Sequence, residues 1–127
     1  MVIGVYRKKA VFKKGYRAEM ELVRMLKDHG FYAVRIPVSG SRVIPCDIIA
    51  SNKERKYAIE VKVTTDEKIY VSKDRIRRLI EFSDYFGLVP IVAVKWKKRF
   101  PNTWSFYVVK SENDNKFNIN DYGIRIF

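Results

Sequence analysis

The chain has 127 residues, a hydrophobic content of 47%, and a formal net charge of +12, from 26 Lys and Arg against 14 Asp and Glu. This length suits one domain, and so large a positive excess predicts a polyanionic partner, either nucleic acid or an anionic membrane surface. No apolar run approaches the roughly 20 residues that cross a bilayer. The single Cys46 excludes an intramolecular disulfide and a zinc finger.

The N-terminal residues do not have the order of a secretory signal, because the apolar residues precede the charges. Together with the lone cysteine, this order predicts an intracellular protein, in the cytoplasm or inside a host cell. We expect a single domain over residues 1–127, with residues 1–14 as a basic arm. The first helix is predicted over about residues 15–29, ending at Gly30. Glu19 falls inside its apolar stripe, where a carboxylate is costly unless a cation meets it.

The rest of the chain predicts strands separated by one further helix. Short runs rich in Ile, Val and aromatic residues indicate strands, and Ser72 is a plausible N-cap for the second helix, which ends before Gly87. We therefore predict an α/β (α+β) fold, with a central mixed sheet of about five strands flanked by helices. The strands are expected at residues 31–36, 44–50, 57–63, 90–96 and 104–109, a short extended piece at 69–71, the helix at 72–86, and a loop at 111–120; residues 122–127 are not placed.

Asp47, Glu60 and Lys62 are the strongest candidates for a reactive site. The polar turn between their two strands predicts a hairpin in which Ala50 pairs with Tyr57, and this register sets Asp47 opposite Glu60. Opposed side chains lie about 5 Å apart, so the two carboxylates would repel each other and raise each other's pKa. A divalent metal ion would remove that conflict, because its hard ligands are oxygens. Lys62 shares a strand face with Glu60 and is directed at the same place.

Simpler interpretations stay open for each of these residues. Asp47, Glu60 and Lys62 could form a surface hairpin with a cross-strand salt bridge, and Glu19 could be a boundary residue whose head reaches water. Ser39, in the small-residue loop before the Asp47 strand, fits an ordinary loop serine as well as a functional one.

Residues 15–19, Asp47 and residues 60–62 together resemble the PD-(D/E)xK nuclease superfamily. Residues 31–41, 69–71 and 80–82 resemble more specifically the archaeal Holliday junction resolvases, including those of archaeal viruses. The similarity covers about residues 12–109. Two departures stand out, since the proline before the aspartate is displaced by one position and Arg75 replaces a glutamine that many relatives carry.

The resemblance implies a restriction-endonuclease-like fold and a homodimeric endonuclease that depends on Mg²⁺, with Mn²⁺ able to substitute. Such enzymes bind four-way DNA junctions and make paired symmetric nicks. Transferred to matching positions, Asp47 and Glu60 would hold the metal with the carbonyl of Val61, and Glu19 would reach it directly or through water. Lys62 would orient or deprotonate the attacking water, and Ser39 would contact the DNA backbone near the cut.

Two groups of residues are expected to bind partners. On the second helix, the apolar arc widens to roughly 160°, which indicates either a partner helix or sheet or a deeply set helix in a monomer. We expect a dimer interface at Leu79, Phe82 and Phe86. The predicted DNA contacts, which would position phosphates without reading sequence, are Lys13, Lys14, Arg17, Arg35 and Arg42.

The sequence therefore favours a structure-selective, metal-dependent endonuclease that resolves four-way junctions. Two alternatives remain. One is another PD-(D/E)xK nuclease of the repair or restriction-like kind, and the other is a non-catalytic basic DNA-binding protein of the same fold.

Overall fold

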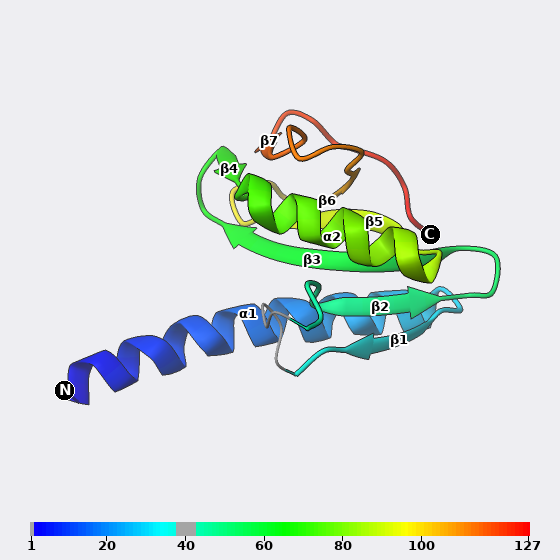
Figure 1. The fold of residues 1–127 in the computed structure, drawn as a ribbon. Coiled ribbons are helices and arrows are strands. Elements are labelled where there is room, and N and C mark those ends of the chain that lie inside the picture. The colour runs from blue at the N-terminus through cyan, green and yellow to red at the C-terminus, as the bar shows by residue number, and fades with distance from the viewer. Residues whose placement is uncertain (1, 38–42) are drawn as a thin grey trace.

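A computed structural model describes residues 2–37 and 43–127, with side chains described from Gly15 onward (Figure 1). The elements in these residues are α1 (Val2–Asp28), β1 (Tyr32–Arg35), β2 (Ile48–Ser51), β3 (Lys56–Thr64), β4 (Lys68–Tyr70), α2 (Lys73–Phe86), β5 (Val89–Trp96), β6 (Trp104–Val108) and β7 (Lys116–Asn118). Strands β1, β2, β3, β5 and β6 form the main sheet in that order, and β4 pairs with β7 in a small second sheet.

The main sheet is mixed, as the sequence predicted. Strands β3 and β5 are parallel and are joined through α2, whereas the other neighbouring pairs are antiparallel. Parallel neighbours need a crossover connection, and a helix that packs on the sheet is its usual form. The described part of the chain thus confirms the prediction of a mixed sheet of about five strands flanked by helices.

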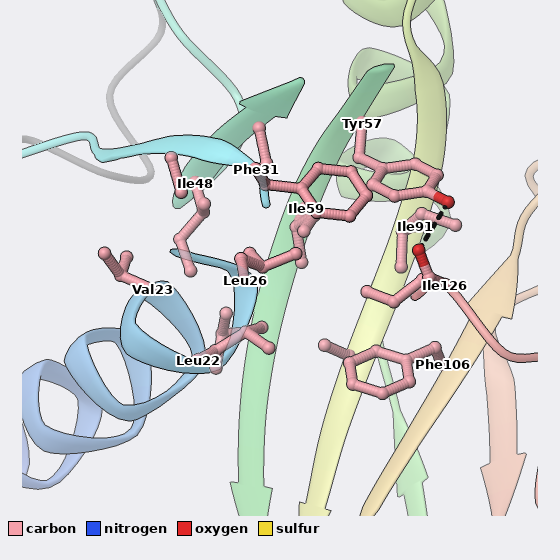
Figure 2. Packing of buried hydrophobic residues seen from close by; sticks show 14 of the residues in the cluster. Leu22, Val23, Leu26, Phe31, Ile48, Tyr57, Ile59, Ile91, Phe106 and Ile126 are labelled. Atoms are coloured by element: carbon pink, nitrogen blue, oxygen red, sulfur yellow. Dashed lines mark hydrogen bonds between the residues drawn. The ribbon is translucent and has the colours of Figure 1, made fainter. Parts of the chain in front are cut away.

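The two helices cover opposite faces of the sheet. Leu22 and Leu26 of α1 belong to one buried cluster together with Ile59 of β3 (Figure 2), whereas Ile76 of α2 belongs to a second cluster with Ala58. Adjacent residues of β3 therefore enter opposite clusters, as the two-residue period of a strand requires. Even-numbered positions of β3 accordingly face the α2 side, which decides where Glu60 points.

The first helix is longer than predicted. It begins at Val2, not near Gly15, and its N-terminal half extends beyond the ends of the strands (Figure 1). The predicted basic arm of residues 1–14 is thus helical from residue 2. This segment contains no proline, and its four lysines, one arginine and one alanine favour helix, while one internal glycine costs only about 1 kcal/mol. None of the helices within residues 2–37 and 43–127 is long and apolar enough to span a membrane.

The predicted helix caps are confirmed in α2. The Ser72 hydroxyl accepts a hydrogen bond from the backbone nitrogen of Arg75 at 3.2 Å, and Gly87 follows the helix with φ of 67°. This cap places Arg75 in the first turn of α2.

Two segments depart from the predicted boundaries. The strand expected from Ile44 begins at Ile48, and the loop expected over residues 111–120 contains β7, whose Phe117 pairs with Ile69. A three-residue polar strand has no periodicity to reveal it, and its partner lies far away in sequence.

The C-terminal residues pack on the sheet. Ile124 forms an isolated bridge with Phe106, and Ile126 is buried with its carbonyl oxygen 2.8 Å from the Tyr57 hydroxyl, which donates the hydrogen bond (Figure 2). This segment therefore closes the core beside β6, a position that the sequence did not predict.

Replacing Gly123 with alanine is expected to destabilise the protein by about 2–4 kcal/mol, from left-handed backbone strain and a steric clash. Gly123 has φ of 69°, and an added Cβ would lie 2.1 Å from the Phe106 carbonyl oxygen. Gly30→Ala is the matched control, because Gly30 has φ of 87° but nothing within 4 Å of an added Cβ. Urea unfolding should show a clearly larger loss for Gly123→Ala, and equal losses would contradict the packing of the C-terminal segment.

Candidate active site

The β2–β3 hairpin has the predicted register. Ala50 pairs with Tyr57 and Ile48 with Ile59. Asp47 lies one residue before β2, beyond the last paired residue Ile48, and its backbone nitrogen donates a hydrogen bond to the Ile59 carbonyl of β3 at 2.8 Å. The Asp47 side chain is buried, and its Oδ2 accepts a hydrogen bond from the Val61 backbone nitrogen at 2.7 Å. Asp47 is thereby fixed on both its backbone and its carboxylate.

Glu60 is a buried carboxylate held by two cations. It is 3% exposed, and Nη2 of Arg75 donates to its Oε1 at 2.9 Å and to its Oε2 at 2.8 Å. Lys62 lies on the same strand face, as predicted, with Nζ 3.5 Å from Oε2. Burial, and after it the charge of Asp47, raises the pKa of Glu60 above its usual value, although Arg75 and Lys62 act in the opposite direction.

Glu19 joins this group from α1. It is 8% exposed, and Oε1 accepts a hydrogen bond from Nε of Arg35, at the end of β1, at 2.8 Å. Burial, followed by the charge of Asp47, raises the pKa of Glu19, and Glu60 adds a smaller effect in the same direction. The three carboxylates predicted from the sequence therefore lie close enough to act on one another.

Cys46 does not supply a nucleophile at this site. It is fully buried, and burial, followed by the charges of Asp47 and Glu60, raises the pKa of its thiol to about 12. The thiolate is the reactive form of cysteine, so this side chain is inert at neutral pH.

The donor set suits a hard divalent cation such as Mg²⁺, because Asp47, Glu60 and Glu19 offer carboxylate oxygens and burial makes their mutual repulsion costly. Among the side chains that the structure describes, however, no three Asp, Glu, His or Cys are close enough together to hold a metal ion. Two of the three carboxylates are instead bound to arginines. The donor chemistry suits such a cation, and binding it would require these ion pairs to rearrange.

The predicted DNA contacts are only partly described. Arg17 is exposed on α1, whereas Arg35 is engaged with Glu19 and lies 4.7 Å over the Tyr16 ring. Ser39 and Arg42 lie outside the described residues, as do the side chains of Lys13 and Lys14, although both lysines belong to α1.

The predicted interface residues divide into a surface pair and a core residue. Phe86 is 67% exposed and lies 4.8 Å from the half-buried Phe82, measured between ring centroids. With Val43, Pro45, Arg78, Glu81 and Tyr85, these two rings line a hollow of about 360 Å³. Leu79, by contrast, is 1% exposed and packs in the core of its own chain. The prediction of Leu79 as an interface residue is therefore wrong, because α2 uses this position to cover the sheet.

Comparison with known proteins decides the family. A model of the family described as archaeal Holliday junction resolvase (Hjc) matches residues 10–125. The chain belongs to this family. Over 103 residues it is 39% identical to the crossover junction endodeoxyribonuclease Hje of Saccharolobus islandicus, covering 79% of this chain and 75% of that protein. Over 91 residues it is 35% identical to the crossover junction endodeoxyribonuclease of Sulfolobus islandicus rod-shaped virus 1, covering 68% of this chain and 74% of the viral protein.

A solved structure agrees with the family assignment. The Hjc of Archaeoglobus fulgidus, titled a Holliday junction resolvase from an archaeal hyperthermophile, matches with a TM-score of 0.71 and 33% identity, covering 84% of this chain and 88% of that one. The predicted resemblance to archaeal and viral resolvases is thus confirmed, and so is the restriction-endonuclease-like fold.

Arg75 contacts Glu60 in this site and was not predicted from the sequence as a site residue. It stood out only as a departure from the family pattern, and its contact with Glu60 depends on how α2 packs against β3. The Ser72 cap predicts that Arg75 lies in the first helical turn, but no local signal predicts which strand that turn faces. Arg75 could have been found only with a tertiary structure.

Proposed function

We propose that this protein is a divalent-cation-dependent endonuclease that resolves four-way DNA junctions by paired symmetric nicks. The observation that carries the proposal is the position of Asp47, Glu60 and Lys62 on one hairpin of a chain that belongs to the Hjc family. The relatives' names as crossover junction endodeoxyribonucleases and the net charge of +12 support a DNA substrate.

Asp47 and Glu60 would hold Mg²⁺, with the carbonyl oxygen of Val61 as a further ligand and Glu19 reaching it directly or through water. Mn²⁺ is expected to substitute. When bound, the cation would offset the phosphodiester charge, lower the pKa of a bound water and support the leaving oxygen. The hydrogen bond from the Val61 nitrogen to Asp47 fixes one carboxylate before any cation arrives, which lowers the reorganisation needed for binding.

Lys62 supplies a positive charge on the same face as Glu60, and its side chain is 32% exposed. A phosphodiester resists attack because it is anionic, and negative charge develops further as the water adds. Lys62 would therefore orient the attacking water and stabilise that charge. The attack needs no covalent protein intermediate, which agrees with the inert thiol of Cys46.

A homodimer would supply the two matched sites that a nearly symmetric junction requires. We propose that Phe82 and Phe86 form part of its interface, because their rings line a surface hollow beside α2 that also contains charged residues at its lining. Phe86 is the better residue to test, since Phe82 also packs against the core.

Phe86→Glu should weaken the dimer, because a charge in an apolar interface is desolvated without a partner, and we expect the dissociation constant to rise at least tenfold. Analytical ultracentrifugation over a concentration series measures this change. Phe100→Glu is the matched control, because Phe100 is 88% exposed in the β5–β6 turn and should not affect assembly. An unchanged dimer with Phe86→Glu would exclude this surface.

The function is tested by cutting a labelled immobile four-way junction and a linear duplex of the same sequence, with Mg²⁺ or with EDTA. Paired, symmetric, Mg²⁺-dependent nicks in the junction alone are the expected result. Cutting of both substrates would instead indicate a general nuclease. Tight binding without cutting in Mg²⁺ or Mn²⁺ would indicate a DNA-binding protein that retains the fold.

A further inference from the structure

Glu60 depends on Arg75 to balance its charge. A carboxylate that is 3% exposed is costly to ionise unless a cation and hydrogen bonds compensate it. Arg75 provides both, because its Nη2 bridges the two carboxylate oxygens at 2.9 and 2.8 Å. Lys62, with Nζ 3.5 Å from Oε2, lies beyond a good hydrogen-bond distance. Arg75 is therefore the principal partner of Glu60.

The Arg75 contact occupies the oxygens that a divalent cation would need. A cation bound at Glu60 would meet a guanidinium group already within 3 Å of the same carboxylate, and like charges at such short range repel. Both cannot hold Glu60 with full strength. Metal binding therefore has to break or weaken the contact between Arg75 and Glu60.

The guanidinium of Arg75 has a route away from the carboxylate. The Arg75 side chain is 30% exposed, whereas its backbone nitrogen is held by the Ser72 hydroxyl at the start of α2. The neighbouring Asp74 does not hold it, because Asp74 pairs with Arg77 and Arg78. The side chain can thus rotate toward solvent while the helix stays in place.

We propose that Arg75 is a positioning residue that competes with the divalent cation for Glu60. In the metal-free protein it serves as the internal counter-ion of this carboxylate, and the cation displaces it on binding. This inference rests on the proposed function, since it concerns the cation that the nuclease would use. It goes further by assigning to Arg75 the control of how tightly Glu60 takes up metal.

Calorimetric titration of Mn²⁺ into the DNA-free protein tests the competition directly. Arg75→Gln should bind Mn²⁺ roughly tenfold more tightly than the unaltered protein, which corresponds to losing one hydrogen bond to a charged group. Arg77→Gln is the matched control, because it removes one positive charge from the same helix at a side chain that is 57% exposed and paired with Asp74. Its Mn²⁺ affinity should equal that of the unaltered protein. If Arg75→Gln does not fold, Arg75→Met, which retains the apolar stem, replaces it.

Thermal unfolding provides the second readout. In EDTA, Arg75→Gln should unfold at a lower temperature than the unaltered protein. Saturating Mn²⁺ should raise the unfolding temperature of Arg75→Gln by more than it raises that of the unaltered protein. A purely structural role for Arg75 would lower the unfolding temperature and weaken Mn²⁺ binding together. Tighter metal binding by the less stable variant therefore distinguishes competition from simple damage.

The outcomes separate this inference from the proposed function. Suppose that the unaltered protein takes up Mn²⁺ and cuts junctions. If Arg75→Gln then binds Mn²⁺ as tightly as the unaltered protein or more weakly, the proposed role of Arg75 is overturned while the proposed function stands. Mn²⁺ uptake by neither protein would overturn both the metal-dependent function and this inference. Mn²⁺ uptake by Arg75→Gln but not by the unaltered protein would support the inference, because Arg75 would then exclude the cation from the DNA-free enzyme.

Discussion

Asp47→Asn should lower the rate of junction cleavage by roughly a thousandfold or more, because several kcal/mol of transition-state stabilisation depend on a correctly held cation. Asparagine keeps the size of the side chain, and its carbonyl oxygen can still accept the hydrogen bond from the Val61 nitrogen. The substitution therefore removes charge without leaving that buried nitrogen unpaired. Single-turnover cleavage of a labelled junction measures the loss.

Junction binding is expected to survive Asp47→Asn, since affinity for DNA depends mainly on Lys and Arg contacts with phosphates. Gel-shift titration in EDTA measures it separately from cleavage. Asp74→Asn is the matched control, because Asp74 is an exposed aspartate of α2 that pairs with Arg77 and Arg78; it should cut at the unaltered rate. Normal cutting by Asp47→Asn would show that the catalytic centre lies elsewhere.

Lys62→Met should reduce cleavage by about 100- to 1,000-fold, the usual effect of removing one group that stabilises developing charge. Methionine keeps the unbranched stem but has no cation. Glu60 would retain Arg75 as its partner in the metal-free state, so the fold should be preserved. Mn²⁺ affinity should not fall, because the lost group is a cation near the site and not a ligand.

The comparison of cleavage with metal binding distinguishes the role of Lys62 from that of Asp47. Asp47→Asn should lose both properties, whereas Lys62→Met should lose only cleavage. Lys56→Met, at the exposed start of β3, is the control for removing a lysine from the same strand. If Lys62→Met cut as fast as the Lys56→Met control, Lys62 would have no part in the chemistry.

The local features of the site could be predicted from the sequence because they lie on one hairpin. A short polar turn joins two recognisable strands and fixes Ala50 opposite Tyr57. The two-residue period of β3 directs Lys62 to the same face as Glu60. The place of Glu19 also followed from the sequence, since a carboxylate within an apolar stripe needs a cation nearby. Arg35 provides that cation.

The features that were missed depend on tertiary packing or on weak local signals. Arg75 meets Glu60 only because the first turn of α2 packs against the face of the sheet that carries Glu60. Leu79 was assigned to an interface because an apolar arc does not show which part of it covers the chain's own sheet. The early start of α1 and the short β7 were missed because charged residues and a three-residue strand carry little pattern.

The central claim is that Asp47 and Glu60 form the metal centre of a resolvase. Diffraction from crystals soaked in saturating Mn²⁺, recorded near the manganese absorption edge, tests it most directly. We predict an anomalous peak within coordination distance of carboxylate oxygens of both residues, with Arg75 moved away from Glu60. An anomalous peak elsewhere, or no peak and an intact contact between Arg75 and Glu60, would contradict the claim.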